Sequence, residues 1–193
     1  MQGCRPLTDE EMKQVADSFT GKFALRDRAI FVTGVKTGFR ISELLSLRVK
    51  DVWQFGRVVD RVTVARKNRK GKPSNHTVAL NEEAQMALAA WLWEMAEKGQ
   101  LQANGPLFRS RKGKRAITRR QALRVFRKSF DENQLDGPLG THSLRKSFAA
   151  KAYEASGHDL LAVQRLLGHS KSTITERYLY TSRDKLDELV RAI

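Results

Sequence analysis

Four residues in the C-terminal third of the chain could together do chemistry on a phosphodiester. His142 and Arg145 lie three residues apart, and residues with this spacing share one face of a helix. His169 follows an apolar run that ends at Gly168, and Tyr178 lies nine residues after this histidine. A guanidinium can bind two phosphate oxygens, an imidazole can transfer protons and a phenol can act as a nucleophile. The spacing therefore predicts a phosphoryl-transfer site.

Each of these features alone is a weak signal. A single tyrosine in a helix is usually a packing residue, and an isolated His-x-x-Arg is usually a surface coincidence. Their fixed order, together with a Gly-x-Arg that ends at Arg40, favours a functional site over coincidence.

The same motifs resemble the tyrosine recombinases, or phage-type integrases, over roughly residues 7 to 181. The matching segments are Thr37-Gly38-Phe39-Arg40-Ile41-Ser42-Glu43-Leu44, His142-Ser143-Leu144-Arg145, Leu167-Gly168-His169 and Tyr178. The resemblance implies an α+β fold that is mainly helical: a catalytic domain with a small antiparallel β-sheet or hairpin.

The resemblance also implies a role for each catalytic residue. Tyr178 would attack the scissile phosphate, form a 3′-phosphotyrosyl bond and release a 5′-hydroxyl. Arg40 and Arg145 would neutralise the non-bridging oxygens, while His142 and His169 would donate to the phosphate or accept the tyrosine proton. Covalent catalysis of this kind needs neither a cofactor nor a metal. No Cys/His cluster, glycine-rich phosphate loop or acidic pair in the sequence suggests one.

The family carries its catalytic lysine on a β-hairpin, and Lys67 is the best match for this general acid. Arg69, Lys70 and Lys72 compete for the position, since the hairpin is long and basic. Ala79 stands where the family commonly has a proline. A basic loop that only contacts phosphates is the alternative.

Two further assignments have alternatives. Glu43 lies three residues after Arg40 and would orient an arginine or histidine side chain, or would form an ordinary helix salt bridge. Tyr180 is a rival nucleophile, but the nine-residue spacing favours Tyr178.

The charge of the chain predicts a polyanionic partner. The 193 residues contain 36 Lys+Arg and 21 Asp+Glu, which gives a formal net charge of +15 and a pI near 10.4. Double-stranded DNA fits this balance better than a membrane, because no long apolar run or amphipathic anchor is evident. Eleven basic residues and no acid occur between Lys98 and Phe130, and such a run can neutralise phosphates. The residues expected to bind DNA are Arg66, Arg69, Lys70, Lys72, Arg111, Lys112, Lys114, Arg119 and Arg120; a solvated basic surface is the alternative.

Capping residues and apolar patterns predict the elements that position these groups. Helices are expected over 8–19, 25–36, 41–47, 81–98, from a Thr118 cap onward, and from the His142/Arg145 motif to Gly157. Short strands are expected over 49–53, 58–65 and 77–80, and an amphipathic helical tail over 182–193. His76 and His158 belong to no motif and are expected on the surface.

The length and composition of the chain limit the number of domains and the cellular compartment that can be expected. A chain of 193 residues fits one catalytic domain, without the N-terminal core-binding domain that integrases usually carry. The only cysteine is Cys4, and residues 1–11 lack a signal-peptide pattern, so a cytoplasmic protein is expected.

The sequence thus predicts a site-specific recombinase or integrase. It would act as a homo-oligomer, a tetramer on paired DNA sites, with possible accessory DNA-bending proteins. The alternatives are a type IB topoisomerase-like enzyme and a catalytically inactive DNA-binding regulator.

Overall fold

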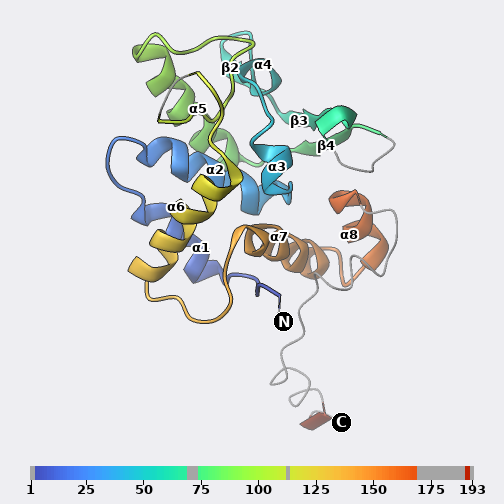
Figure 1. Ribbon diagram of the computed structural model, residues 1–193. Helices are drawn as coiled ribbons and strands as arrows, with labels where there is room; N and C mark the ends of the chain where they lie inside the picture. The colour runs from blue at the N-terminus through green and yellow to red at the C-terminus, as the bar shows by residue number, and fades with distance from the viewer. Residues whose placement is uncertain (1–2, 69–73, 112–113, 169–189, 192–193) are drawn as a thin grey trace.

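The computed structural model describes residues 3–68, 74–111, 114–168 and 190–191, and it is mainly helical with two small antiparallel sheets (Figure 1). The helices are α1 (Asp9–Ser18), α2 (Ala24–Thr37), α3 (Ile41–Leu44), α4 (Val49–Val52), α5 (Glu82–Glu97), α6 (Arg119–Glu132), α7 (Thr141–Ala155) and α8 (Leu160–Leu167). The strands are β1 (Trp53–Gln54), β2 (Arg57–Val58), β3 (Arg61–Val64) and β4 (His76–Ala79). The predicted fold class is confirmed.

Local side chains start the helices where the sequence predicts. Thr8 accepts a hydrogen bond from the Glu11 amide, and Asn81 accepts one from the Ala84 amide. Thr118 caps α6 in the same way, through the Gln121 amide. Each cap satisfies an amide that has no partner within its own helix.

Helix α2 is the centre of the core, and it contacts α1, α3, α5, α6 and α7. Ile30, Phe31 and Val32 are all buried, so the helix is enclosed on several sides. Helix α7 approaches α2 closely at Gly34, where a Cβ atom would lie 2.6 Å from Cδ2 of Leu144. A larger residue at this position would have to displace the buried Leu144 side chain, so glycine favours the observed contact between these two helices.

The strands differ from the sequence prediction in two places. The expected strand 49–53 is wrong, because residues 49–52 form helix α4. The Asp51 carboxylate accepts the Arg48 amide at 2.8 Å and so stabilises a helical turn despite the β-branched valines. The expected strand 58–65 is divided between β2, which pairs with β1, and β3, which pairs with β4.

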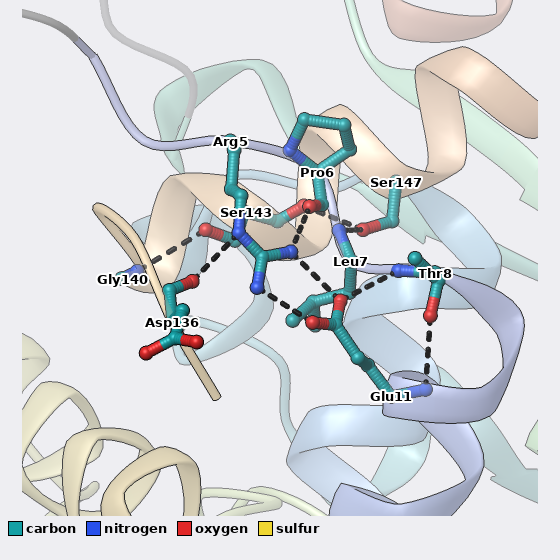
Figure 2. A network of polar contacts seen from close by, with 9 residues as sticks. All are labelled: Arg5, Pro6, Leu7, Thr8, Glu11, Asp136, Gly140, Ser143 and Ser147. Atoms are coloured by element: carbon teal, nitrogen blue, oxygen red, sulfur yellow. Dashed lines mark hydrogen bonds and ion pairs between the residues drawn. The ribbon is translucent and has the colours of Figure 1, made fainter. Parts of the chain in front are cut away.

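The N-terminal segment is hydrogen-bonded to the start of α7 (Figure 2). The Leu7 amide donates to Oγ of Ser147 at 2.8 Å, and this hydroxyl donates to the Ser143 carbonyl at 2.9 Å. Arg5 forms an ion pair with Glu11 and donates to the Asp136 carbonyl at 2.8 Å. The Leu7 contact holds α7, the helix that carries His142 and Arg145, and the Arg5 contacts hold the loop that precedes it.

Within the described residues, no helix has both the length and the apolar character required to cross a lipid bilayer.

Candidate active site

Arg40 lies directly before α3 and is held by Glu43. Its backbone amide donates to Oε2 of Glu43 at 2.9 Å, and its Nη1 donates to Oε1 of the same carboxylate at 2.9 Å. The Glu43 side chain is 2 % exposed, whereas 28 % of the Arg40 side chain is exposed. A buried carboxylate therefore fixes an arginine that still faces solvent, and the orienting role of Glu43 stays a prediction beside the alternative of an ordinary helix salt bridge.

A tight turn at Gly38 sets the position of Arg40. Gly38 ends α2 with a φ of 65°, a left-handed conformation that glycine adopts without a steric cost. A Cβ atom here would also lie 2.3 Å from Cδ1 of Phe148. Both the backbone conformation and the contact with α7 thus require glycine.

Arg145 joins the C-terminal ends of two helices. Its Nη1 donates to the carbonyl of Gly38, the residue after α2. Its Nη2 donates to the carbonyl of Leu167, the last residue of α8, at 2.8 Å. Carbonyl groups at helix C-termini lack intrahelical partners and carry the negative end of the helix dipole, so they stabilise a cation. The side chain is only 1 % exposed, which fixes the guanidinium firmly.

His142 lies one helical turn before Arg145, with an exposed side chain. Partial desolvation lowers its pKa below the ordinary value, and the positive charges of Arg145, Arg40 and Lys146 lower it further. These interactions place His142 in the electrostatic field of both motif arginines. A neutral imidazole at pH 7 can accept a proton or donate its N–H to a phosphate oxygen.

Lys67 lies near the end of the described first half of the hairpin. It lies in a single 3-10 turn, Arg66–Asn68, that follows β3. Its side chain is exposed and lines a cleft of about 150 Å³ together with Arg48 and Asp51. The structure thus brings together Arg40, Glu43, His142 and Arg145, while Lys67 is assigned to the site by its motif alone.

Several predicted residues lie outside the described part of the chain. They are His169, Tyr178, the rival Tyr180, the hairpin residues Arg69, Lys70 and Lys72, the loop residue Lys112, and most of the tail 182–193.

The remaining expected DNA-binding residues are exposed. They are Arg66, Arg111, Lys114, Arg119 and Arg120. Arg109, from the same basic run, instead donates to the Gln100 carbonyl at 3.4 Å. That arginine has a structural contact, so not every residue of the run faces solvent.

The prediction that His76 lies on the surface is wrong. Its side chain is 7 % exposed, and its Nε2 lies 2.8 Å from the Leu166 carbonyl. The ring also packs edge-on against Phe39, with centroids 5.4 Å apart and planes at 85°. The alternation of β4 could have revealed this burial, because His76 shares the inward face with Val78. His158 is exposed, as predicted.

Comparisons with known proteins agree with the motifs. The model of the phage integrase family matches residues 5–185. The tyrosine recombinase XerC of Pelobacter propionicus is 33% identical over 167 residues, which cover 86% of this chain and 51% of the relative. The probable integrase/recombinase YoeC of Bacillus subtilis is 31% identical over 180 residues, covering 93% of this chain and 91% of the relative. The chain therefore spans about half the length of the XerC relative and most of the length of YoeC.

Solved structures share the fold. The XerA recombinase superposes with a TM-score of 0.77 at 23% identity, over 99% of this chain and 66% of that one. The XerH site-specific recombinase, in a post-cleavage complex with a palindromic difH substrate, gives a TM-score of 0.75 at 27% identity. That match covers 96% of this chain and 51% of the XerH chain. From the motifs, the fold and the family match, the chain belongs to the phage integrase family of tyrosine recombinases.

Proposed function

We propose that this protein is a site-specific DNA recombinase that cleaves and rejoins strands through a 3′-phosphotyrosine intermediate. The observation that carries the proposal is the cluster of Arg40, His142 and Arg145, in which two fixed cations flank a histidine of lowered pKa. Such a cluster suits a phosphodiester, whose two non-bridging oxygens share one negative charge, because preorganised charge stabilises a transition state most effectively.

In the proposed reaction the Oη atom of Tyr178 attacks the phosphorus, and the bond to the 5′-oxygen breaks. The proton of the tyrosine passes to a histidine, His142 or His169, because a phenol with a pKa near 10 does not ionise readily at neutral pH. Lys67 gives a proton to the departing 5′-oxygen. The new phosphotyrosyl bond preserves the diester, so the 5′-hydroxyl of a partner strand can reverse the step without ATP.

Double-stranded DNA is the proposed partner. The net charge of +15 and the exposed arginines at the start of α6 support electrostatic binding to phosphates. The XerH relative is described in complex with its difH substrate, which supports the same class of partner here.

We also propose that several copies assemble on paired sites. Exchange between two duplexes requires four strands to be cut, and each cut consumes one tyrosine, so a tetramer supplies the required number. Removal of residues 183–193 is expected to leave a folded domain that binds one site but no longer forms multimers on paired sites. Sedimentation of the protein with DNA tests this expectation, and loss of the folded domain on truncation would contradict it.

The decisive experiment is adduct formation on a nicked suicide substrate. The wild type should form a covalent protein–DNA band on a denaturing gel, and the band should persist in EDTA. Tyr178→Phe should abolish the band while DNA binding remains, and Tyr180→Phe should form it normally. A band that requires magnesium, or that depends on Tyr180, would refute the proposed mechanism. Plasmid relaxation without strand exchange would point to a topoisomerase, and binding without any adduct would point to a regulator.

A further inference from the structure

The C-terminal end of α8 is held by side chains from two other elements. His76 of β4 contacts the Leu166 carbonyl at 2.8 Å, and Arg145 of α7 contacts the Leu167 carbonyl at 2.8 Å. These are consecutive residues, and the predicted catalytic His169 follows two positions later.

All of the last four carbonyl groups of α8 therefore have partners. The amide of Gly168, which has a left-handed conformation, donates to the carbonyls of Gln164 and Arg165. The next two carbonyls cannot be satisfied within the helix, and the two side chains supply the donors. His76 is thus part of the cap that ends α8.

The contact with a carbonyl determines which nitrogen of the His76 ring carries a proton. A carbonyl oxygen only accepts hydrogen bonds, so Nε2 must carry the proton. The edge-on contact with Phe39 fixes the plane of the ring. Phe39 is the residue before Arg40, so His76 contacts both the first arginine motif and the end of α8.

We propose that His76 is a positioning residue for the strand-transfer reaction. It holds the C-terminal end of α8, two residues before the end of the Leu-Gly-His motif at His169, and its proposed effect on the reaction acts through that histidine. Because β4 pairs with β3, which leads into the turn containing Lys67, the same contact also links the lysine hairpin to the C-terminal segment. This inference rests on the proposed function.

The position could be filled by an apolar residue if packing were its only role. A leucine would occupy similar space beside Phe39 but would remove the donor from the Leu166 carbonyl, which costs the energy of that hydrogen bond. Glutamine can place its amide nitrogen near the position of Nε2, whereas asparagine is too short to do so. These substitutions therefore distinguish the effect of the hydrogen bond from the effect of side-chain packing.

The first experiment measures the rate of adduct formation in His76→Leu, His76→Gln and His76→Asn. We expect His76→Leu and His76→Asn to lose about 10- to 100-fold in rate, since a displacement of about 1 Å can cost this much. His76→Gln should recover most of the rate. Thr77→Val is the matched control, because it removes one hydrogen bond on the outer face of β4, between the hydroxyls of Thr63 and Thr77 at 2.8 Å, and leaves α8 untouched. An equal loss in Thr77→Val and His76→Leu, or no rescue by glutamine, would overturn the proposal.

A double-mutant cycle then tests whether His76 acts through His169. In a His169→Ala background, His76→Leu should change the rate by less than about threefold, because residues that act as a unit are strongly non-additive. The full 10- to 100-fold effect in both backgrounds would show a merely structural role.

A measurement without DNA distinguishes failure of this inference from failure of the proposed function. Long-range ¹H–¹⁵N NMR should show a proton on Nε2 of His76, and hydrogen exchange at the Gly168 amide should be faster in His76→Leu than in His76→Gln. If these results hold but the wild type forms no adduct, the proposed function is wrong while the cap contact stands. A His76 ring protonated only on Nδ1 would refute the contact itself.

Discussion

The Arg145 guanidinium donates to the carbonyl oxygen of Leu167 at 2.8 Å, 22 residues further along the chain. The same group reaches back to Gly38 at the end of α2. One buried side chain thus links the first arginine motif, its own helix and the start of the segment that contains His169.

Replacement of Arg145 by lysine should damage both folding and cleavage. An ammonium is a compact charge without the planar fork of arginine, so it cannot donate to both carbonyls. Loss of one hydrogen bond to a charged group should lower the free energy of unfolding by about 1.5–3 kcal/mol. Guanidinium denaturation and the adduct assay measure the two effects. Arg127→Lys, at an exposed position of α6, is the control. If Arg145→Lys has as small an effect as this control, the two-pronged hydrogen bonding of the Arg145 guanidinium is unimportant.

Substitution of Glu43 by glutamine should lower the cleavage rate more than DNA affinity. The amide keeps the shape but loses the charge that binds Nη1 of Arg40, so the arginine is less firmly placed. We expect about a tenfold or greater loss in adduct formation with nearly unchanged binding. Glu97→Gln, on the exposed C-terminal turn of α5, controls for the change in net charge. Loss of binding in step with cleavage would argue against an orienting role.

His142 should make the protein less stable in mild acid. Its pKa is lowered in the folded state, so the folded protein resists protonation more than the unfolded chain does. Stability is therefore complete above the ordinary value of about 6.5 and decreases as the pH falls toward the lowered pKa. Denaturation curves between about pH 7.5 and pH 5 should show a smaller loss in His142→Gln than in the wild type.

The electrostatic cause of the lowered His142 pKa can be tested separately. Lys146→Gln removes one of the three cations that lower the pKa of His142, so the pKa should rise, as an NMR titration can measure. A lower pKa in this variant would contradict the electrostatic explanation.

The start of α6 should contribute to DNA affinity in a salt-dependent way. Arg119→Ala and Arg120→Ala should each reduce the log–log salt slope of binding by roughly 0.9 if the side chain contacts one phosphate. Fluorescence anisotropy at several salt concentrations measures the slope. Lys13→Ala, which removes a partner of Asp17 on α1, is the control for net charge. Slopes that match the wild type would place both arginines in solvent.

Features that depend on local sequence could be predicted, and long-range contacts could not. The caps at Thr8, Asn81 and Thr118 act within three residues, and Arg40 and Glu43 are also three residues apart. By contrast, Arg145 and Gly38 are separated by 107 residues. The prediction of a strand at 49–53 failed because the valines suggested β-structure while Asp51 stabilises a helical turn.

His76 is an example of a long-range contact that the sequence did not predict. Its partner Leu166 lies 90 residues away, and no catalytic motif includes it. Only the alternation within β4 indicated that it faces inward, and alternation cannot identify the carbonyl that it meets.

The hydrogen bond between Leu7 and α7 has a practical consequence for tethering the protein. Any force applied ahead of residue 5, from a fusion partner or a surface linker, is transmitted through the Arg5–Glu11 ion pair and the Leu7–Ser147 hydrogen bond. Ser147, the acceptor of that hydrogen bond, lies on α7 two residues after Arg145. Tension at the N-terminal side therefore acts on α7, the helix that carries Arg145. A long, flexible linker at this position should keep such tension away from the helix.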